Sequence, residues 1–402
     1  MADQVTRDRR CLCTAAFLRA FAVGLSGVLI ALHLATKGLD SRSVGALVSL
    51  GLAGSAGWAL LAMLFADRVG RRRFLIVLSI AMIAGGVALV LLDGTVALGA
   101  AFMLGALNGM GRDRGAGPVI EQAALPSTTS PAQRTQAFAW YNVLQDAGHA
   151  FGALCAGLPV LLGKAFDLDR AAGTSATLWL APAAIAIAGA SYLGLSDGIE
   201  SKTPRKREPM SRDTRARLWK ISSLFALDSL AGGLLTTALL SYFFFERFGV
   251  GVGELGLLFF GARVLNALSH LAAAWLARRI GLVNTMVFTH IPSSLLLVTV
   301  AIAPNFPVAA VLFLLREGLV EMDVPTRQSY VMAVVREDER TLASGVTNVV
   351  RMASWSVGPV FAGYFMRNVS LYTPLIIGAA MKILYDILLY AAFRGVRPPE
   401  ET

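Results

Sequence analysis

A short charged segment, Phe65-Ala66-Asp67-Arg68-Val69-Gly70-Arg71-Arg72-Arg73-Phe74-Leu75, separates two long apolar runs. Gly70 lets the backbone turn where a side chain would clash, and Asp67 can accept hydrogen bonds from an arginine or from a helix N-terminus. A generic basic loop would explain the arginines alone. Arginines beside apolar runs favour the cytoplasmic side of a membrane, so the segment predicts a cytoplasmic hinge between two membrane helices.

The residue order is more specific than the charge. The pattern D-R-x-G-R-R-x-x-L, which begins at Asp67, resembles the loop between helices 2 and 3 of the major facilitator superfamily. That family usually has glycine four residues before the aspartate, where this chain has Met63. The resemblance implies a cytoplasmic gate made of Asp67, Arg68, Gly70 and Arg71.

The composition places the chain in a membrane. Its 402 residues are 55% hydrophobic and only 15% charged, with a mean hydropathy of +0.62, which is too apolar for a soluble enzyme. Apolar runs of roughly 20 residues recur and lack the alternation of a membrane barrel. The net charge of +10 lies mostly in loops, so we interpret it as a topology signal and expect no nucleic-acid partner. The three cysteines lack metal-finger spacing and no catalytic motif is present, so we expect no metal, no cofactor and no enzymatic activity.

The apolar runs predict an all-α polytopic membrane protein with twelve spans. Arginines and lysines cluster on the side that carries both ends of the chain, which predicts cytoplasmic termini and a multi-pass protein of the cell membrane. The predicted spans are 12–35, 43–65, 74–92, 97–124, 136–162, 174–195, 219–244, 254–277, 283–303, 307–334, 341–366 and 372–393.

An internal repeat divides these spans into two parallel sets of six. Placing Arg134 on Arg340 also pairs Asn142 with Asn348 and continues through the glycines of both segments, including Gly152 with Gly358. The long polar break after span 6 then acts as a linker. We predict an N-terminal half at 1–196, a cytoplasmic linker at 197–218 and a C-terminal half at 219–402.

Many charged residues fall inside the spans. A charge at the bilayer centre costs at least about 2.5–3.5 kcal/mol on insertion scales, so each needs a partner or a water-filled cavity. Helical spacing places some of these residues on one face of a helix. The three stripes are Asn142, Asp146 and His149 on span 5; Arg263, Asn266 and His270 on span 8; and Arg316, Asp323 and Arg327 on span 10. We expect Pro325 to bend span 10 beside its stripe. Salt bridges that lock helices together are the alternative explanation, and Lys382 with Asp386 is the pair that we expect to neutralise itself.

The resemblance assigns positions to these residues. In the superfamily, spans 1, 4, 7 and 10 line a central cavity, flanked by spans 2, 5, 8 and 11. This makes Arg19, Asp113, Asp228, Asp323 and Arg327 candidates for the cavity, and places the stripe of Asn142, Asp146 and His149, with Arg263 and His270, beside it. A buried carboxylate or imidazole can change its protonation as its solvation changes, so we expect Asp228, as an isolated carboxylate, to carry a coupling proton, with Asp146 as its rival.

We therefore predict a secondary active transporter that moves a small polar or ionic solute by alternating access, with protons as the coupling ion. We expect it to act as a monomer in the lipid bilayer. The alternatives are a multidrug/proton antiporter that exports amphipathic compounds, which would need a large aromatic and aliphatic cavity, and a non-transporting membrane sensor of the same fold, which would bind a ligand without flux. A membrane-embedded enzyme ranks third.

Overall fold

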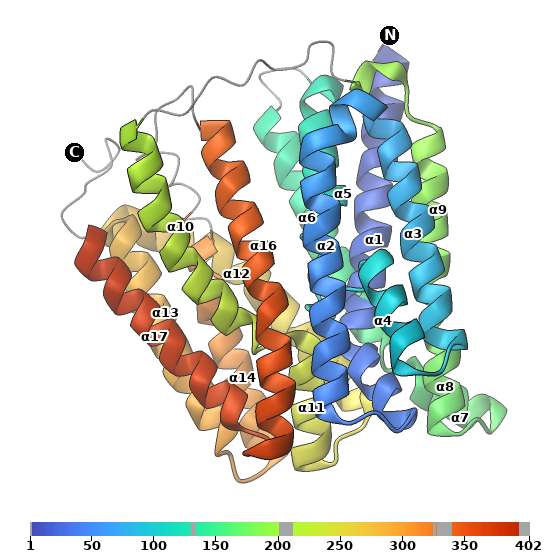
Figure 1. Ribbon diagram of the computed structural model, residues 1–402, viewed down its shortest axis with the longest axis vertical. Coiled ribbons are helices and arrows are strands. Elements are labelled where there is room, and N and C mark those ends of the chain that lie inside the picture. Colours follow the sequence, from blue (N-terminus) through green and yellow to red (C-terminus); the bar gives the residue numbers. More distant parts are fainter. Residues whose placement is uncertain (1, 130–133, 201–211, 325–326, 328–339, 394–402) are drawn as a thin grey trace. The chain divides into compact units, whose positions relative to one another are not determined.

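Helices make up the regular structure of this chain (Figure 1). The computed structural model describes residues 2–129, 134–200, 212–324, 327 and 340–393. Within these ranges no strand occurs, and nine helical segments are long and apolar enough to cross a membrane. Helices also lie within the three remaining predicted spans, the fourth, tenth and eleventh.

The chain forms two compact units. The first contains Met1–Lys206 and Thr236–Phe260, and the second contains Arg207–Leu235 and Gly261–Thr402. The helices of the first unit are α1 (Ala2–Thr36), α2 (Ser41–Val69), α3 (Arg71–Leu91), α4 (Thr95–Leu104), α5 (Ala116–Ala124), α6 (Arg134–Cys155), α7 (Leu158–Phe166), α8 (Arg170–Leu178), α9 (Leu180–Leu193) and α11 (Thr237–Phe248), with the start of α12 (Val252–Ile280).

In the first unit, α1 is the central helix. It packs along α6 and α9, and most of its apolar stretch is buried. Gly148 and Gly152 of α6 touch the backbone of α1, where a Cβ would overlap the carbonyl oxygens of Phe17 and Phe21. Small residues allow this contact because helices in lipid associate by close packing rather than by the hydrophobic effect.

The second unit repeats this relationship between its own helices. Gly358 of α16 meets Gly233 of α10 so closely that a Cβ on either would overlap the backbone of the other. Gly358 is the repeat partner of Gly152, and each glycine packs against the first helix of its unit. The helices of this unit are α10 (Arg212–Gly233), most of α12, α13 (Leu282–Ala301), α14 (Phe306–Val320), α16 (Arg340–Asn368) and α17 (Thr373–Phe393).

Some predicted spans are not continuous helices. Span 4 was expected over 97–124, but it is interrupted between α4 and α5, where Gly105, Gly109, Gly111 and Gly115 weaken the helix. Span 5 breaks at Ala156–Gly157, span 6 at Trp179, and span 7 at residues 234–236. Span 10 leaves the regular helix after Val320, and Pro325 lies outside the described residues.

The division at the linker stays a prediction. Residues 201–211, which form most of the predicted linker, lie outside the described residues. Asp197–Ile199 forms a single 3-10 turn that follows α9.

Candidate functional site

The predicted gate is an ion-paired turn at the junction of α2 and α3. Gly70 has a φ of 101°, a conformation that favours glycine, and its position separates the two helices. Across the turn, the Arg71 side chain donates a hydrogen bond of 2.9 Å to Asp67. Arg68, the fourth gate residue, is exposed. The sequence thus identified both the turn and the acceptor, although the arginine comes from within the same segment.

Glu200 completes this turn, although it lies far from it in the sequence. Its carboxylate accepts hydrogen bonds from the backbone N–H groups of Arg71 (2.7 Å) and Arg72 (3.2 Å), the first two residues of α3. A carboxylate at a helix N-terminus satisfies free N–H groups and complements the helix dipole. The Arg71 guanidinium also donates to the carbonyl oxygen of Ile199. The segment after α9 is therefore bound to the hinge, which no local sequence signal indicates.

Arg19, on α1, is the centre of a buried network in the first unit. Its guanidinium donates two hydrogen bonds of 2.7 Å to the two carboxylate oxygens of Glu121 on α5, and it also pairs with Asp113. Tyr141 of α6 and Tyr192 of α9 donate to the same carboxylate, at 2.5 and 2.6 Å. Arg19 and Glu121 are 3% and 0% exposed. Their charges are compensated by this network, as burial requires.

Asp113 lies in the interruption of span 4, not in a helix as expected. Its backbone N–H donates a 2.7 Å hydrogen bond to Nε2 of His149 on α6, while its carboxylate pairs with Arg19. The structure thus brings together three predicted site residues from spans 1, 4 and 5. On the same helix as His149, Asp146 is half-buried and Asn142 is exposed, so the three members of the predicted stripe differ in environment.

The interruption of span 4 also contacts the start of α11. At the start of α11, the Ala238 N–H donates to the Gly109 carbonyl (2.9 Å) and the Thr237 hydroxyl donates to the Met110 carbonyl (2.8 Å). Backbone groups freed from one broken helix are therefore satisfied by another, as membrane helices require.

Asp228, on α10, is the centre of a second buried network and is not the isolated carboxylate that the sequence suggested. Lys382 of α17 lies 2.8 Å from one of its oxygens. The other oxygen faces Arg327 at 3.4 Å and Arg351 of α16 at 3.9 Å. Arg327 also pairs with Asp323 at 2.6 Å, four residues earlier. Three predicted site residues, Asp228, Asp323 and Arg327, therefore meet in the second unit.

Lys382 and Asp386 do not neutralise each other as expected. Lys382 turns to Asp228, and both oxygens of Asp386 contact Nδ1 of His290 on α13, at 3.0 and 3.1 Å. Spacing along one helix allowed the local pair, but each residue has a partner on a neighbouring helix. His290 itself was missed, because a single histidine in an apolar run carries no pattern.

The remaining predicted residues lie along α12. The Arg263 guanidinium reaches the side-chain oxygen of Asn266 at 3.5 Å, and the Asn266 amide donates to Glu317 of α14 at 2.9 Å. Glu317 in turn pairs with its neighbour Arg316. His270 is half-buried one turn beyond Asn266. Because Arg316 pairs with Glu317 and α14 ends at Val320, the stripe predicted for span 10 does not form along one regular helix.

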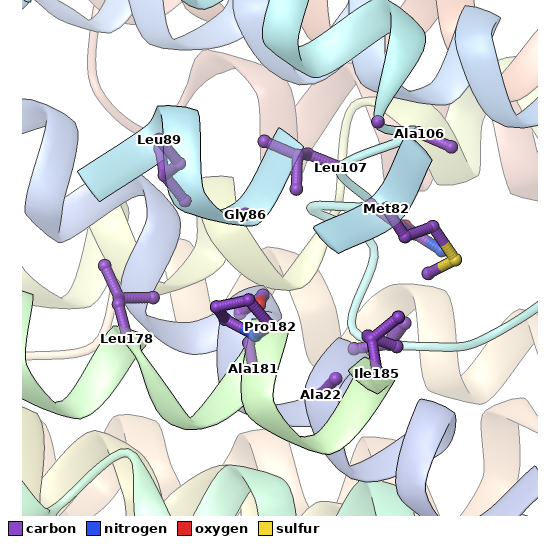
Figure 2. A pocket seen from close by; sticks show the side chains of 14 residues that line it. Ala22, Met82, Gly86, Leu89, Ala106, Leu107, Leu178, Ala181, Pro182 and Ile185 are labelled. Atoms are coloured by element: carbon purple, nitrogen blue, oxygen red, sulfur yellow. The ribbon is translucent and has the colours of Figure 1, made fainter. Parts of the chain in front are cut away.

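A small apolar cavity lies within the first unit (Figure 2). Figure 2 shows Gly86 and Leu89 of α3 facing Leu178, Ala181 and Pro182 of α8 and α9. Its volume of about 30 Å³ is that of roughly one water molecule, whereas solute sites measure about 300–1,000 Å³. This cavity is therefore too small to be the substrate site.

Comparison with known proteins identifies relatives along the whole chain. A model of the Major Facilitator Superfamily matches residues 12–315 and 221–402. The chain is 26% identical, over 431 aligned residues, to YJR124C, an uncharacterized membrane protein of Saccharomyces cerevisiae. That alignment covers 97% of this chain and 95% of the relative.

Solved transporter structures share the fold. A D-xylose-proton symporter superposes with a TM-score of 0.75 at 12% identity, covering 96% of this chain and 97% of that one. The nucleoside transporter NupG superposes with a TM-score of 0.73 at 16% identity, covering 96% and 99%. A POT family transporter, solved with a thioalcohol-conjugated peptide, gives 0.75 at 13% identity and covers 96% of each chain. The TM-scores establish a shared fold, whereas the low sequence identities leave the substrate of this chain open.

Proposed function

Because this chain belongs to the Major Facilitator Superfamily, we propose that it is a proton-coupled secondary transporter, which moves a small polar or ionic solute by alternating access of two six-helix halves. The observation that carries this proposal is the pair of buried ionic networks. Each unit contains one such network, which surrounds a charged residue of the first helix of that unit: Arg19 on α1 and Asp228 on α10. The D-xylose-proton symporter, which shares the fold, provides a precedent for coupling to protons.

The cost of these networks supports a functional role. Each charge inserted near the bilayer centre costs at least about 2.5–3.5 kcal/mol before it is paired, and small-residue packing alone already joins α1 to α6 and α10 to α16. A purely structural role would not need so many ionised groups. Intramembrane ionisable residues are therefore functional candidates by default.

The charges around Asp228 favour a polar substrate with a negative group. Lys382, Arg327 and Arg351 converge on one carboxylate, so an arginine can exchange a contact with Asp228 for one with a substrate anion. We assign Arg19, Asp113, Asp228, Asp323 and Arg327 to the substrate and proton pathway. Asn142, Asp146, His149, Arg263 and His270 flank it in this proposal.

We assign the hinge to gating. Asp67, Arg68, Gly70 and Arg71 would form a cytoplasmic latch, with both chain termini on that side of the membrane. The Asp67–Arg71 ion pair and the Glu200 carboxylate on the first turn of α3 support this assignment, since both contacts must change if α2 and α3 move relative to each other.

A ligand screen by thermal stabilisation tests the proposal. A solute that binds the folded protein raises its unfolding temperature, because the stabilisation grows as RT ln(1 + [L]/Kd). We expect small anions or zwitterions to stabilise the purified protein. The shift should disappear in Arg327→Gln but persist in Asp93→Asn, because the exposed Asp93 carboxylate pairs with Lys37, outside both networks. Stabilisation only by hydrophobic cations would contradict the substrate class and favour the multidrug alternative.

A further inference from the structure

We propose that His290, on α13, is a proton-binding site of the second unit, and that it takes up its proton in exchange for its contact with Lys382. The inference rests on the proposed function, because coupling to protons requires a group that binds one. It moves the proton site away from Asp228, the carboxylate that the sequence favoured.

The contacts form a continuous chain across three helices. Asp386 of α17 lies 3.0 Å from Nδ1 of His290, and Nε2 of the same ring lies 3.3 Å from the Lys382 ammonium. Lys382 then lies 2.8 Å from Asp228 of α10. The exposed fractions of His290, Lys382 and Asp386 are 1%, 7% and 0%, so the chain is shielded from solvent.

These partners determine where the ring carries its proton. An ammonium group only donates, so Nε2 of His290 must accept from Lys382. A neutral imidazole carries one N–H, and this hydrogen is therefore on Nδ1, which donates to the Asp386 carboxylate. These contacts fit a ring in the Nδ1–H form.

A second proton on this ring is incompatible with the contact to Lys382. Protonated Nε2 would become a donor facing a donor, and two positive charges would lie 3.3 Å apart. Lys382 must then withdraw, which weakens its 2.8 Å contact with Asp228 and leaves that carboxylate to Arg327 and Arg351. Proton binding at His290 thus alters the connection between α17 and α10, the first helix of the unit.

The groups around His290 support this assignment. Besides Lys382 and Asp386, α17 contributes Tyr385, whose ring lies edge-on to the His290 ring with 6.1 Å between the ring centroids. On α14, which also packs against α13, the charged residues Arg316 and Glu317 pair with each other. Asp228 of α10 is the next carboxylate, and its oxygens already contact Lys382, Arg327 and Arg351. Nε2 of the imidazole is thus the proton-accepting atom that faces Lys382.

Nuclear magnetic resonance of the full chain in lipid nanodiscs tests the proposal without a substrate. The chain has four histidines, so ¹⁵N-labelled ring signals can be assigned by their loss in His290→Gln and in the other single variants. We expect His290 in the Nδ1–H form near neutral pH, and a doubly protonated ring within a titration from about pH 9 to about pH 5. The Nζ signal of ¹⁵N-labelled Lys382, identified by its loss in Lys382→Met, should change at the same pH.

His33 provides a control for the ring assignment. Its Nε2 lies 3.2 Å from the carbonyl oxygen of Leu89, which only accepts, so His33 must carry its proton on Nε2. The spectrum should therefore show opposite ring forms for His33 and His290.

Three outcomes would overturn the inference: an Nε2–H ring at His290, a ring that stays neutral throughout the titration, or a Lys382 signal that does not respond with it. Absence of gradient-driven flux in proteoliposomes, with the titration as expected, would contradict the proposed function instead. The two failures are thus distinguishable.

Discussion

Lys382 on α17 places its ammonium 2.8 Å from the Asp228 carboxylate on α10, although Asp386 lies one turn further along its own helix. The lysine therefore connects two helices, and Asp386 is left to bind His290 of a third. This exchange of partners creates the ionic network of the second unit.

Removal of one partner of the Lys382–Asp228 contact should strongly destabilise the protein. Removing one partner of a buried ion pair leaves an uncompensated charge, so Lys382→Met should destabilise the protein by about 3–5 kcal/mol, reduced by the remaining arginines. The double variant Lys382→Met/Asp228→Asn should recover part of this loss. Thermal unfolding in detergent measures both. Asp93→Asn is the control, because the exposed Asp93 carboxylate should contribute only about 0–1 kcal/mol through its ion pair with Lys37. Equal losses for both pairs would show that Lys382 is not paired as described.

The Glu121 carboxylate should depend on both tyrosines. Tyr141→Phe and Tyr192→Phe each remove one donor to a fully buried carboxylate, and we expect each to lower the free energy of unfolding by about 1–3 kcal/mol. Tyr242→Phe is the matched control, because Tyr242 lies outside this network. If the three substitutions have the same small effect, the tyrosines do not stabilise Glu121.

The contact between α1 and α6 should not tolerate a methyl group. Gly152→Ala would place its Cβ against the Phe21 carbonyl and should cost about 1–3 kcal/mol. Gly57→Ala on α2 is the same substitution with no atom within 4 Å, and it should be neutral or stabilise by about 0.5–1 kcal/mol. Folded yield and thermal unfolding report the difference. A stable Gly152→Ala protein would mean that the two helices are not in close contact.

The hinge should act as a conformational latch. Asp67→Asn removes the acceptor of Arg71, and Glu200→Gln removes the charge that binds the first turn of α3. Both should shift the balance of accessibility to cysteine reagents between the two membrane faces, while Asp93→Asn should not. Wild-type accessibility in both hinge variants would refute the latch. Labelling of a cysteine at position 72 from outside the cell would overturn the predicted topology.

The sequence was informative where chemistry is local. The hinge could be predicted because Asp67, Gly70 and Arg71 lie within five residues, and the glycines of the repeat indicated close packing before any helix was placed. Glycine also made the interruption of span 4 unpredictable. Glycine is common in membrane helices, so Gly105 to Gly115 did not distinguish a packed helix from an interrupted one.

Partners that are distant in the chain could not be predicted. Glu200 contacts Arg71, which lies 129 positions earlier, and Tyr192 contacts Glu121, which lies 71 positions earlier. Neither Glu200 nor Tyr192 belongs to a sequence pattern that would indicate its partner. For Lys382 the local rule pointed to Asp386, and the tertiary structure supplied Asp228 instead. The candidates were found from their charge, whereas their pairing depends on the fold.

Gradient-driven flux in proteoliposomes tests most directly whether this protein couples a proton gradient to the movement of a polar solute. With the ligand found by thermal stabilisation, wild-type protein should drive uphill transport that collapses when a protonophore removes the gradient. Asp228→Asn and His290→Gln should lose uphill transport but retain some exchange, and Asp93→Asn should resemble wild type. Loss of uphill transport in Asp146→Asn, with Asp228→Asn unimpaired, would transfer the coupling role to α6. If transport by the wild-type protein never accumulates solute beyond equilibrium, whatever gradient is imposed, the protein does not couple a proton gradient to solute movement.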